Sequence, residues 1–138
     1  MSSTDVVAVV SAWQEAVNRQ DADGLLALSA PGIEVGGPRG SGYGHQLLRE
    51  WLARAGLRLT TERIFARGEV VVVAQRGVWA GQVPGAAPVE RHLASRFRVT
   101  GGRVAQFARY DDLATALAAA GLDDADEVPV GPAFDPLV

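Results

Sequence analysis

Apolar residues recur at helical spacing near the start of the chain. Val6, Val10, Trp13 and Val17 share one face, which predicts an amphipathic helix over residues 4–20. Glu15, Asn18 and Arg19 lie off this stripe. The first element is therefore expected to bury one stripe against the rest of the protein.

Two further helices are indicated before residue 56. Asp21 is placed to cap a short helix that continues to Ser29. A third helix is predicted over residues 43–55, with Gly56 placed to end it. Its apolar face consists of Leu47, Leu48, Trp51 and Leu52. Between these helices, residues 33–35 indicate a short strand, and the glycine-rich residues 36–44 indicate a loop.

The pattern changes to that of strands after residue 56. One hairpin is predicted from residues 57–67 and 70–80, and a second from residues 91–100 and 103–110. A last helix over residues 113–120 is expected to start at Asp111 or Asp112, and Gly121 follows it. Helices followed by a strand meander predict an α+β domain whose helices cover one face of a curved antiparallel sheet.

The chain is divided into residues 1–122, which carry this pattern, and an acidic, proline-containing tail over residues 123–138. The tail has five acidic and no basic side chains. It is expected to be an extended arm, and its apolar residues are candidates for docking on a partner surface. These residues are Val128, Val130, Phe134 and Leu137.

Composition excludes several classes of protein. The 138 residues include no cysteine, so disulfides, thiolate zinc sites and cysteine nucleophiles are ruled out. No apolar run is long enough to span a bilayer, and residues 1–5 do not resemble a signal peptide. A formal net charge of −3, with dispersed arginines, argues against nucleic-acid binding. We expect a cytoplasmic protein with no nucleic-acid or membrane partner.

The order of these elements resembles the nuclear transport factor 2-like superfamily, and within it the SnoaL-like proteins and ketosteroid isomerases. The resemblance covers about residues 4–122 and rests on residues 9–13, 18–24, 40–51, 97–104 and 109–113. It implies a cystatin-like α+β barrel, in which a cone-shaped, curved antiparallel sheet wraps around helices. It also implies a pocket for apolar small molecules and a homodimer.

The catalytic positions of known members are altered in this chain. In the isomerases, a tyrosine position corresponds to Trp13, the aspartate base to Val35, and a second oxyanion donor to Ser95. Valine cannot take a proton, so steroid-type isomerisation is not expected. The limonene-type epoxide hydrolases have an arginine whose position corresponds to Arg76. Their two catalytic aspartates correspond to Val78 and to a position near Arg109, so both acids are missing here.

Alternation along the strands predicts which side chains face such a pocket. If Ser95 points inward, we expect Arg109 and Asp111 to do so from the paired strand, and Arg76 from the other hairpin. Arginine keeps its proton when buried, so it requires an anionic partner. We therefore hypothesise that Arg76 and Arg109 stabilise an anionic or enolisable carbonyl compound while Asp111 transfers a proton. Ligand contacts are expected from Trp13, Val35, Tyr43, Trp51, Val78, Ser95 and Phe107.

Alternatives remain open for these residues. The arginines could form structural ion pairs with Asp111 or Asp112, and either aspartate could be a helix cap. Two histidines far apart in the sequence do not indicate a metal site, and we expect neither a metal nor an organic cofactor. The leading interpretation is a pocket protein for a small organic molecule, as a cyclase-, isomerase- or hydrolase-like enzyme. The competing interpretations are a non-catalytic ligand-binding or interaction module and a dimeric scaffold with a filled pocket.

Overall fold

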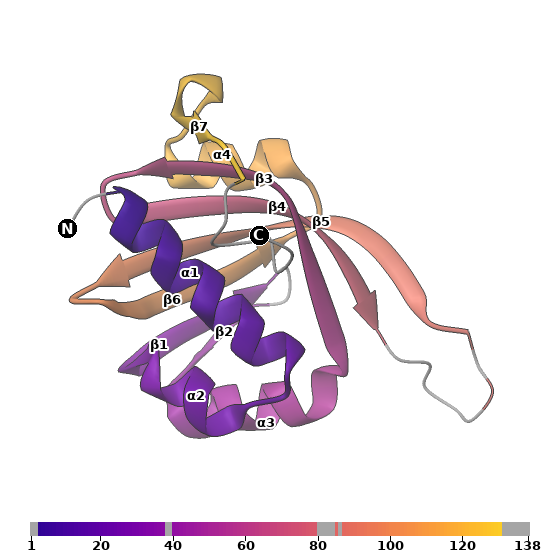
Figure 1. The fold of residues 1–138 in the computed structure, drawn as a ribbon. Coiled ribbons are helices and arrows are strands. Elements are labelled where there is room, and N and C mark those ends of the chain that lie inside the picture. Colours follow the sequence, from indigo (N-terminus) through magenta and orange to yellow (C-terminus); the bar gives the residue numbers. More distant parts are fainter. Residues whose placement is uncertain (1–2, 38–39, 80–84, 86, 131–138) are drawn as a thin grey trace.

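A computed structural model describes residues 3–37, 40–79, 85 and 87–130. Within these residues, four α-helices and seven strands follow one another in a mixed order (Figure 1). The helices are α1 (Ser3–Asn18), α2 (Ala22–Ala27), α3 (His45–Ala55) and α4 (Leu113–Ala120), with a 3-10 turn, η1, at Asp124–Asp126. The strands are β1 (Ser29–Gly37), β2 (Gly40–Tyr43), β3 (Leu57–Arg67), β4 (Val70–Trp79), β5 (Val89–Thr100), β6 (Arg103–Tyr110) and β7 (Glu127–Val128).

All seven strands form one sheet, in the order β2-β1-β6-β5-β4-β3-β7. Neighbouring strands are antiparallel, except that β1 runs parallel to β6. The sheet curves around α1, while α2 and α3 lie at one end of it (Figure 1). The expected α+β class with a curved sheet wrapped around helices is thereby confirmed.

The two faces of the sheet bury different clusters. On the concave face, α1 contacts four central strands, and its apolar stripe Val6, Val10, Trp13 and Val17 is fully buried there. On the opposite face, α4 packs against β4 and β5 and covers a smaller cluster. That cluster consists of Phe65, Val72, Ala94, Ala116 and Leu122. Burial on both faces explains why the four consecutive valines of β4, residues 70–73, do not alternate with polar residues.

Helix boundaries follow the local capping signals. Asp21 caps α2 by accepting a hydrogen bond from the backbone N–H of Gly24 at 3.0 Å. Of the two aspartates considered for α4, Asp112 is the cap, and it accepts from the backbone N–H of Thr115 at 2.7 Å. Gly56 and Gly121 end α3 and α4 in the left-handed conformation, with φ of 52° and 71°.

The loop expected over residues 36–44 is a wrong prediction. Gly36 and Gly37 belong to β1, and Gly40–Tyr43 is β2, which pairs with β1 at the edge of the sheet. Tyr43 is therefore a strand residue, and α3 begins two residues later than expected, at His45. Glycines are poor strand formers in isolation, but here pairing with β1 supplies the backbone hydrogen bonds that keep them extended.

The first part of the acidic segment is attached to the sheet. β7 pairs with β3, where Val128 lies opposite Ile64 and Glu127 opposite Phe65. Arg63 donates two hydrogen bonds to Glu127, at 2.8 and 2.9 Å, which hold the pKa of this exposed carboxyl below its usual value. Phe134 and Leu137, two of the docking candidates, lie outside the described residues.

Candidate functional site

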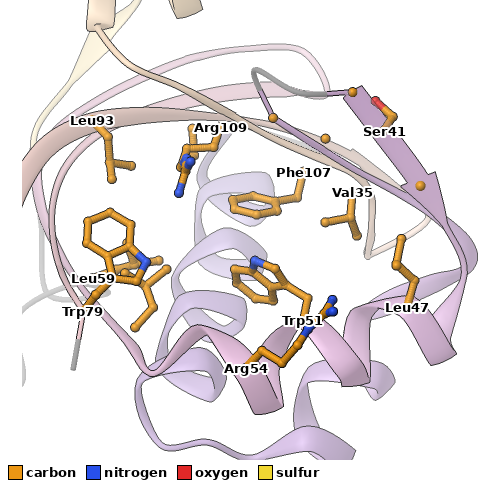
Figure 2. A pocket seen from close by; sticks show the side chains of 16 residues that line it. Val35, Ser41, Leu47, Trp51, Arg54, Leu59, Trp79, Leu93, Phe107 and Arg109 are labelled. Atoms are coloured by element: carbon orange, nitrogen blue, oxygen red, sulfur yellow. The ribbon is translucent and has the colours of Figure 1, made fainter. Parts of the chain in front are cut away.

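A cavity of about 700 Å³ lies between the concave face of the sheet and α3 (Figure 2). Its wall comes from β1, β2 and α3 on one side and from β3 to β6 on the other. Most of the wall is apolar or glycine. The larger apolar side chains in the wall are those of Val35, Leu47, Trp51, Leu57, Leu59, Trp79, Leu93 and Phe107.

Arg109 is the charged residue that the sheet contributes to this cavity. It lies on β6 directly opposite Ser95 of β5, and both residues line the wall. The guanidinium carbon of Arg109 lies 5.7 Å from the centre of the Trp79 ring. Among the described residues, no carboxylate oxygen lies within 4.0 Å of its nitrogens. A half-buried cation thus faces the cavity against an aromatic ring, and no carboxylate among the described residues is close enough to form an ion pair with it.

The cavity wall contains a second arginine. Arg54, in the last turn of α3, is exposed and lines the same cavity. Among the described residues, the salt bridges likewise include no partner for Arg54. No aspartate, glutamate or histidine contributes to the described part of the wall. The described part of the wall is therefore positively charged and has no side chain that takes up a proton near neutral pH.

Aromatic rings form the floor between the helices and the sheet. The ring centres of Trp51 and Phe107, both in the wall, lie 5.4 Å apart. Trp13 lies 4.8 Å from Phe107 but behind it, fully buried and outside the cavity wall. Its indole N–H donates to Ser29 Oγ at 3.0 Å, and Ser29 Oγ donates in turn to the Leu25 carbonyl at 2.7 Å. The expectation that Trp13 contacts the ligand is therefore not supported by its position.

A buried chain of hydrogen bonds supports the sheet side of the site. Ser95 Oγ donates to Gln75 Oε1 at 2.7 Å, and Gln75 Nε2 donates to Gln14 Oε1. Gln14 Nε2 then donates to Thr61 Oγ1 at 3.1 Å. Ser95 and Gln75 are fully buried. This chain satisfies polar groups inside the core and ties α1 to three strands beside the cavity.

The inward orientation expected for Arg76 is wrong. In β4 the residues facing the concave side are Val73 and Gln75, which lie opposite Ser95 and Leu93. Arg76 is one position away and so points to the other face, where its Nε lies 3.6 Å from Glu90 Oε1. The unbroken valine run in β4 has no alternation from which the correct face could be inferred.

Asp111 does not join Arg109 in the cavity. It follows the end of β6, is exposed, and lies 3.6 Å from an Arg91 nitrogen. It borders an adjoining hollow of about 390 Å³, which shares Arg109, Ser41 and two glycines with the cavity and also contains Glu34, Arg96 and Thr115. Because alternation ends where the strand ends, the strand pattern does not extend to Asp111.

The other expected contacts divide into two groups. Val35, Trp51, Ser95 and Phe107 line the cavity, although Ser95 is fully buried and its Oγ donates to Gln75. Tyr43 and Val78 are outside its wall, and Tyr43 is 67% exposed at the end of β2. The sequence prediction did not include the remaining lining residues, which are Ser41, Leu47, Arg54, Leu57, Leu59, Trp79, Leu93 and the glycines of the β1–β2 hairpin. Leu93 could have been found from the parity of β5, since it shares a face with Ser95, whereas Trp79 lies on β4, where the sequence gives no such signal.

The histidines occupy other positions. His45 Nε2 lies 3.0 Å from the Ser29 carbonyl, so this nitrogen donates, and His45 is not part of the cavity wall. His92 Nδ1 contacts Glu62 at 2.9 Å on the exposed outer surface. Within the described ranges, no three histidine, aspartate or glutamate side chains cluster in a manner suited to a metal ion.

The helices of the described residues include none that is long and apolar enough to cross a membrane.

Solved structures place this architecture in the nuclear transport factor 2-like superfamily. The chain matches the SnoaL-like domain over residues 10–107, and it belongs to that family. No curated protein sequence matches the chain.

Three similar structures illustrate the range of this fold. A nuclear transport factor 2-like protein from Burkholderia xenovorans is 28% identical, with 87% of this chain and 98% of that chain covered and a TM-score of 0.68. The epoxide hydrolase/cyclase-like enzyme SalBIII has a role in pyran ring formation in the polyether salinomycin. It is 16% identical, with 80% of this chain and 93% of that chain covered and a TM-score of 0.73. TerC, co-crystallised with polyporic acid, is 18% identical, with 84% and 97% covered and a TM-score of 0.70.

Proposed function

We propose that this SnoaL-like protein binds an apolar small molecule through an anionic or enolisable carbonyl oxygen that contacts Arg109. The observation that carries the proposal is the position of this guanidinium in the cavity wall without a carboxylate partner among the described residues. Arginine retains its charge at all relevant pH values, so the site attracts an anion in every protonation state of the rest of the protein.

The remaining wall favours a ligand with an apolar body. Trp51, Phe107 and Trp79 offer ring faces, and Val35 and several leucines complete the surface. A cavity of about 700 Å³ is in the range used for drug-sized molecules. TerC, which shares this fold, was co-crystallised with polyporic acid, and this ligand, an acid by its name, supports the proposal of an acidic ligand here.

Ligand binding without catalysis is the form of this proposal that the wall supports best. Arg109 would stabilise an enolate electrostatically, but the described wall has no carboxylate or imidazole that would move a proton. Asp111, expected to do so, lies outside the cavity beside Arg91. A cyclase- or isomerase-like reaction in this cavity would therefore take its base from the substrate or from water.

Titration calorimetry with 2-naphthoate and its uncharged analogue 2-acetylnaphthalene tests the proposal. We expect 2-naphthoate to bind more tightly, and Arg109→Met to weaken its affinity by about tenfold or more, as for loss of a charge-assisted hydrogen bond. Arg76→Met is the matched control, because it removes the same charge from the outer face of the sheet. Equal affinities of wild type and Arg109→Met for 2-naphthoate would contradict the proposal.

The expected homodimer and cytoplasmic location remain part of the proposal. Sedimentation velocity at several protein concentrations tests the first, and fluorescence microscopy of a tagged chain in its source cells tests the second.

A further inference from the structure

The cavity has two cationic ends rather than one. Arg109 reaches it from β6 and Arg54 from α3, and both lack an ion-pair partner among the described residues. Figure 2 shows the two side chains on opposite sides of the cavity, with Phe107 and Trp51 between them in that view. The gap between the charges is therefore lined by rings.

No aspartate or glutamate in the described part of the wall balances its positive charge. The two arginines are its only charged residues within the described part of the chain. Three surface arginines are paired, Arg19 with Glu15, Arg49 with Asp23, and Arg63 with Glu127. Exposed Arg58, Arg98 and Arg103 have no ion-pair partner among the described residues, so the feature that distinguishes Arg54 is its place in the cavity wall. Arg49 lies on the same helix as Arg54, so α3 carries one paired and one unpaired arginine, and the unpaired one borders the cavity.

We propose that the cavity takes an elongated, ring-containing compound with an acidic group at each end, one bound by Arg109 and the other by Arg54. This rests on the proposed function, because it uses the same cavity and the same contact to Arg109. The planar guanidinium of each arginine matches a carboxylate or a similar pair of oxygens, and the rings of Phe107 and Trp51 match a flat apolar body. Two charges at opposite ends would also fix the direction in which the ligand lies.

The test compares monoacids with diacids of the same skeleton. The pairs are benzoate with terephthalate, 2-naphthoate with naphthalene-2,6-dicarboxylate, and biphenyl-4-carboxylate with biphenyl-4,4′-dicarboxylate, measured by calorimetry at constant ionic strength. For the pair whose length matches the cavity, we expect the diacid to bind about fivefold more tightly, as for a partly exposed ion pair. Raising the salt concentration should reduce this advantage.

Variants assign the effect to Arg54. Arg54→Met should abolish the diacid advantage while changing monoacid affinity by less than about twofold, whereas Arg109→Met should weaken both acids. Arg58→Met is the matched control, since Arg58 is exposed on β3 and outside the cavity wall. Equal affinities within every pair, or a diacid advantage that persists in Arg54→Met, would overturn the second acidic group and leave the proposed function standing. Insensitivity of every acid to Arg109→Met would overturn both.

Discussion

The guanidinium carbon of Arg109 lies 5.7 Å from the centre of the Trp79 ring, and both residues line the cavity. Trp79 is the last residue of β4, two strands away from Arg109 on β6. The ring spans the intervening strand and holds the cation on the concave side. An aromatic ring orients a guanidinium without neutralising it, so the charge stays available to a ligand.

Replacement of this ring should weaken ligand binding indirectly. Trp79→Leu removes the attraction that orients Arg109, and we expect the affinity for 2-naphthoate to fall by about two- to fivefold, as for a contact of about 0.5–1 kcal/mol. Trp79→Phe keeps a ring at this position and should retain part of the affinity. Calorimetry of both variants measures these affinities. A loss of affinity in Trp79→Phe as large as that in Trp79→Leu would argue against the role of the ring.

Gly37 should set the space available at the β1–β2 side of the cavity. A Cβ atom added there meets no heavy atom within 4 Å, and Gly37 is not among the glycines with positive φ. Gly37→Leu should therefore fold normally and lower the affinity for naphthoate by about tenfold or more, because its side chain occupies ligand space. Gly32→Leu is the control, since Gly32 also has open space around it but lies outside the cavity wall.

Trp13 should contribute to stability rather than to binding. Trp13→Phe removes the hydrogen bond to Ser29 Oγ and part of a fully buried ring, and it should lower the free energy of unfolding by about 1–3 kcal/mol. Urea denaturation measures this change. Ligand affinity should stay near that of wild type, whereas Trp51→Phe should lower it, because Trp51 is in the cavity wall. A larger loss of binding in Trp13→Phe than in Trp51→Phe would contradict this division.

The cap of α4 should make stability depend on pH. Hydrogen bonds from the backbone N–H and then the hydroxyl of Thr115 lower the pKa of Asp112 from its usual value. A carboxyl whose pKa is lower in the folded state stabilises the protein above its unfolded pKa, near 4, and this contribution is lost as the pH falls through the folded pKa. Asp112→Ala should thus lower the melting temperature most at neutral pH, and the difference should shrink in acid.

Asp112→Asn is the matched variant for this cap. Asparagine caps helices well but does not titrate, so its contribution should change less with pH than that of aspartate. Melting curves of the three proteins between pH 3 and 7 provide the comparison. A difference between wild type and Asp112→Ala that stays constant over this range would show that the ionised carboxyl is not what stabilises the helix.

Local patterns were sufficient where neighbouring residues define an element. The stripe from Val6 to Val17 predicted α1, Asp21 predicted the start of α2, and the strand pattern of residues 91–100 and 103–110 predicted the hairpin of β5 and β6. In each case the signal lies within a few residues of the structure that it specifies. The hairpin of β1 and β2 was missed because its glycines are held extended by pairing, which their own preferences do not indicate.

The candidate site was predicted only in part, because the sequence shows which face is buried in some strands and not in others. In β5 and β6, Phe97 and Phe107 mark the buried face, so the inward position of Ser95 and Arg109 followed from alternation. In β4, four valines in a row are buried on both faces, and the face of Arg76 could not be read from them. Arg54 gives no signal at all, because an arginine in the last turn of a helix is ordinary.

The linear pattern was therefore enough to specify the helices, most strands, the α+β class and an inward-facing Arg109, since all of these depend on short-range periodicity. It was not enough to specify the membership of the cavity. A shift of one residue along a strand moves a side chain to the opposite face, and the pairing of β4 with β5 sets that choice. Packing of the folded chain brings Trp79 to Arg109 and places Arg54 across the cavity, although these residues lie far apart in the sequence.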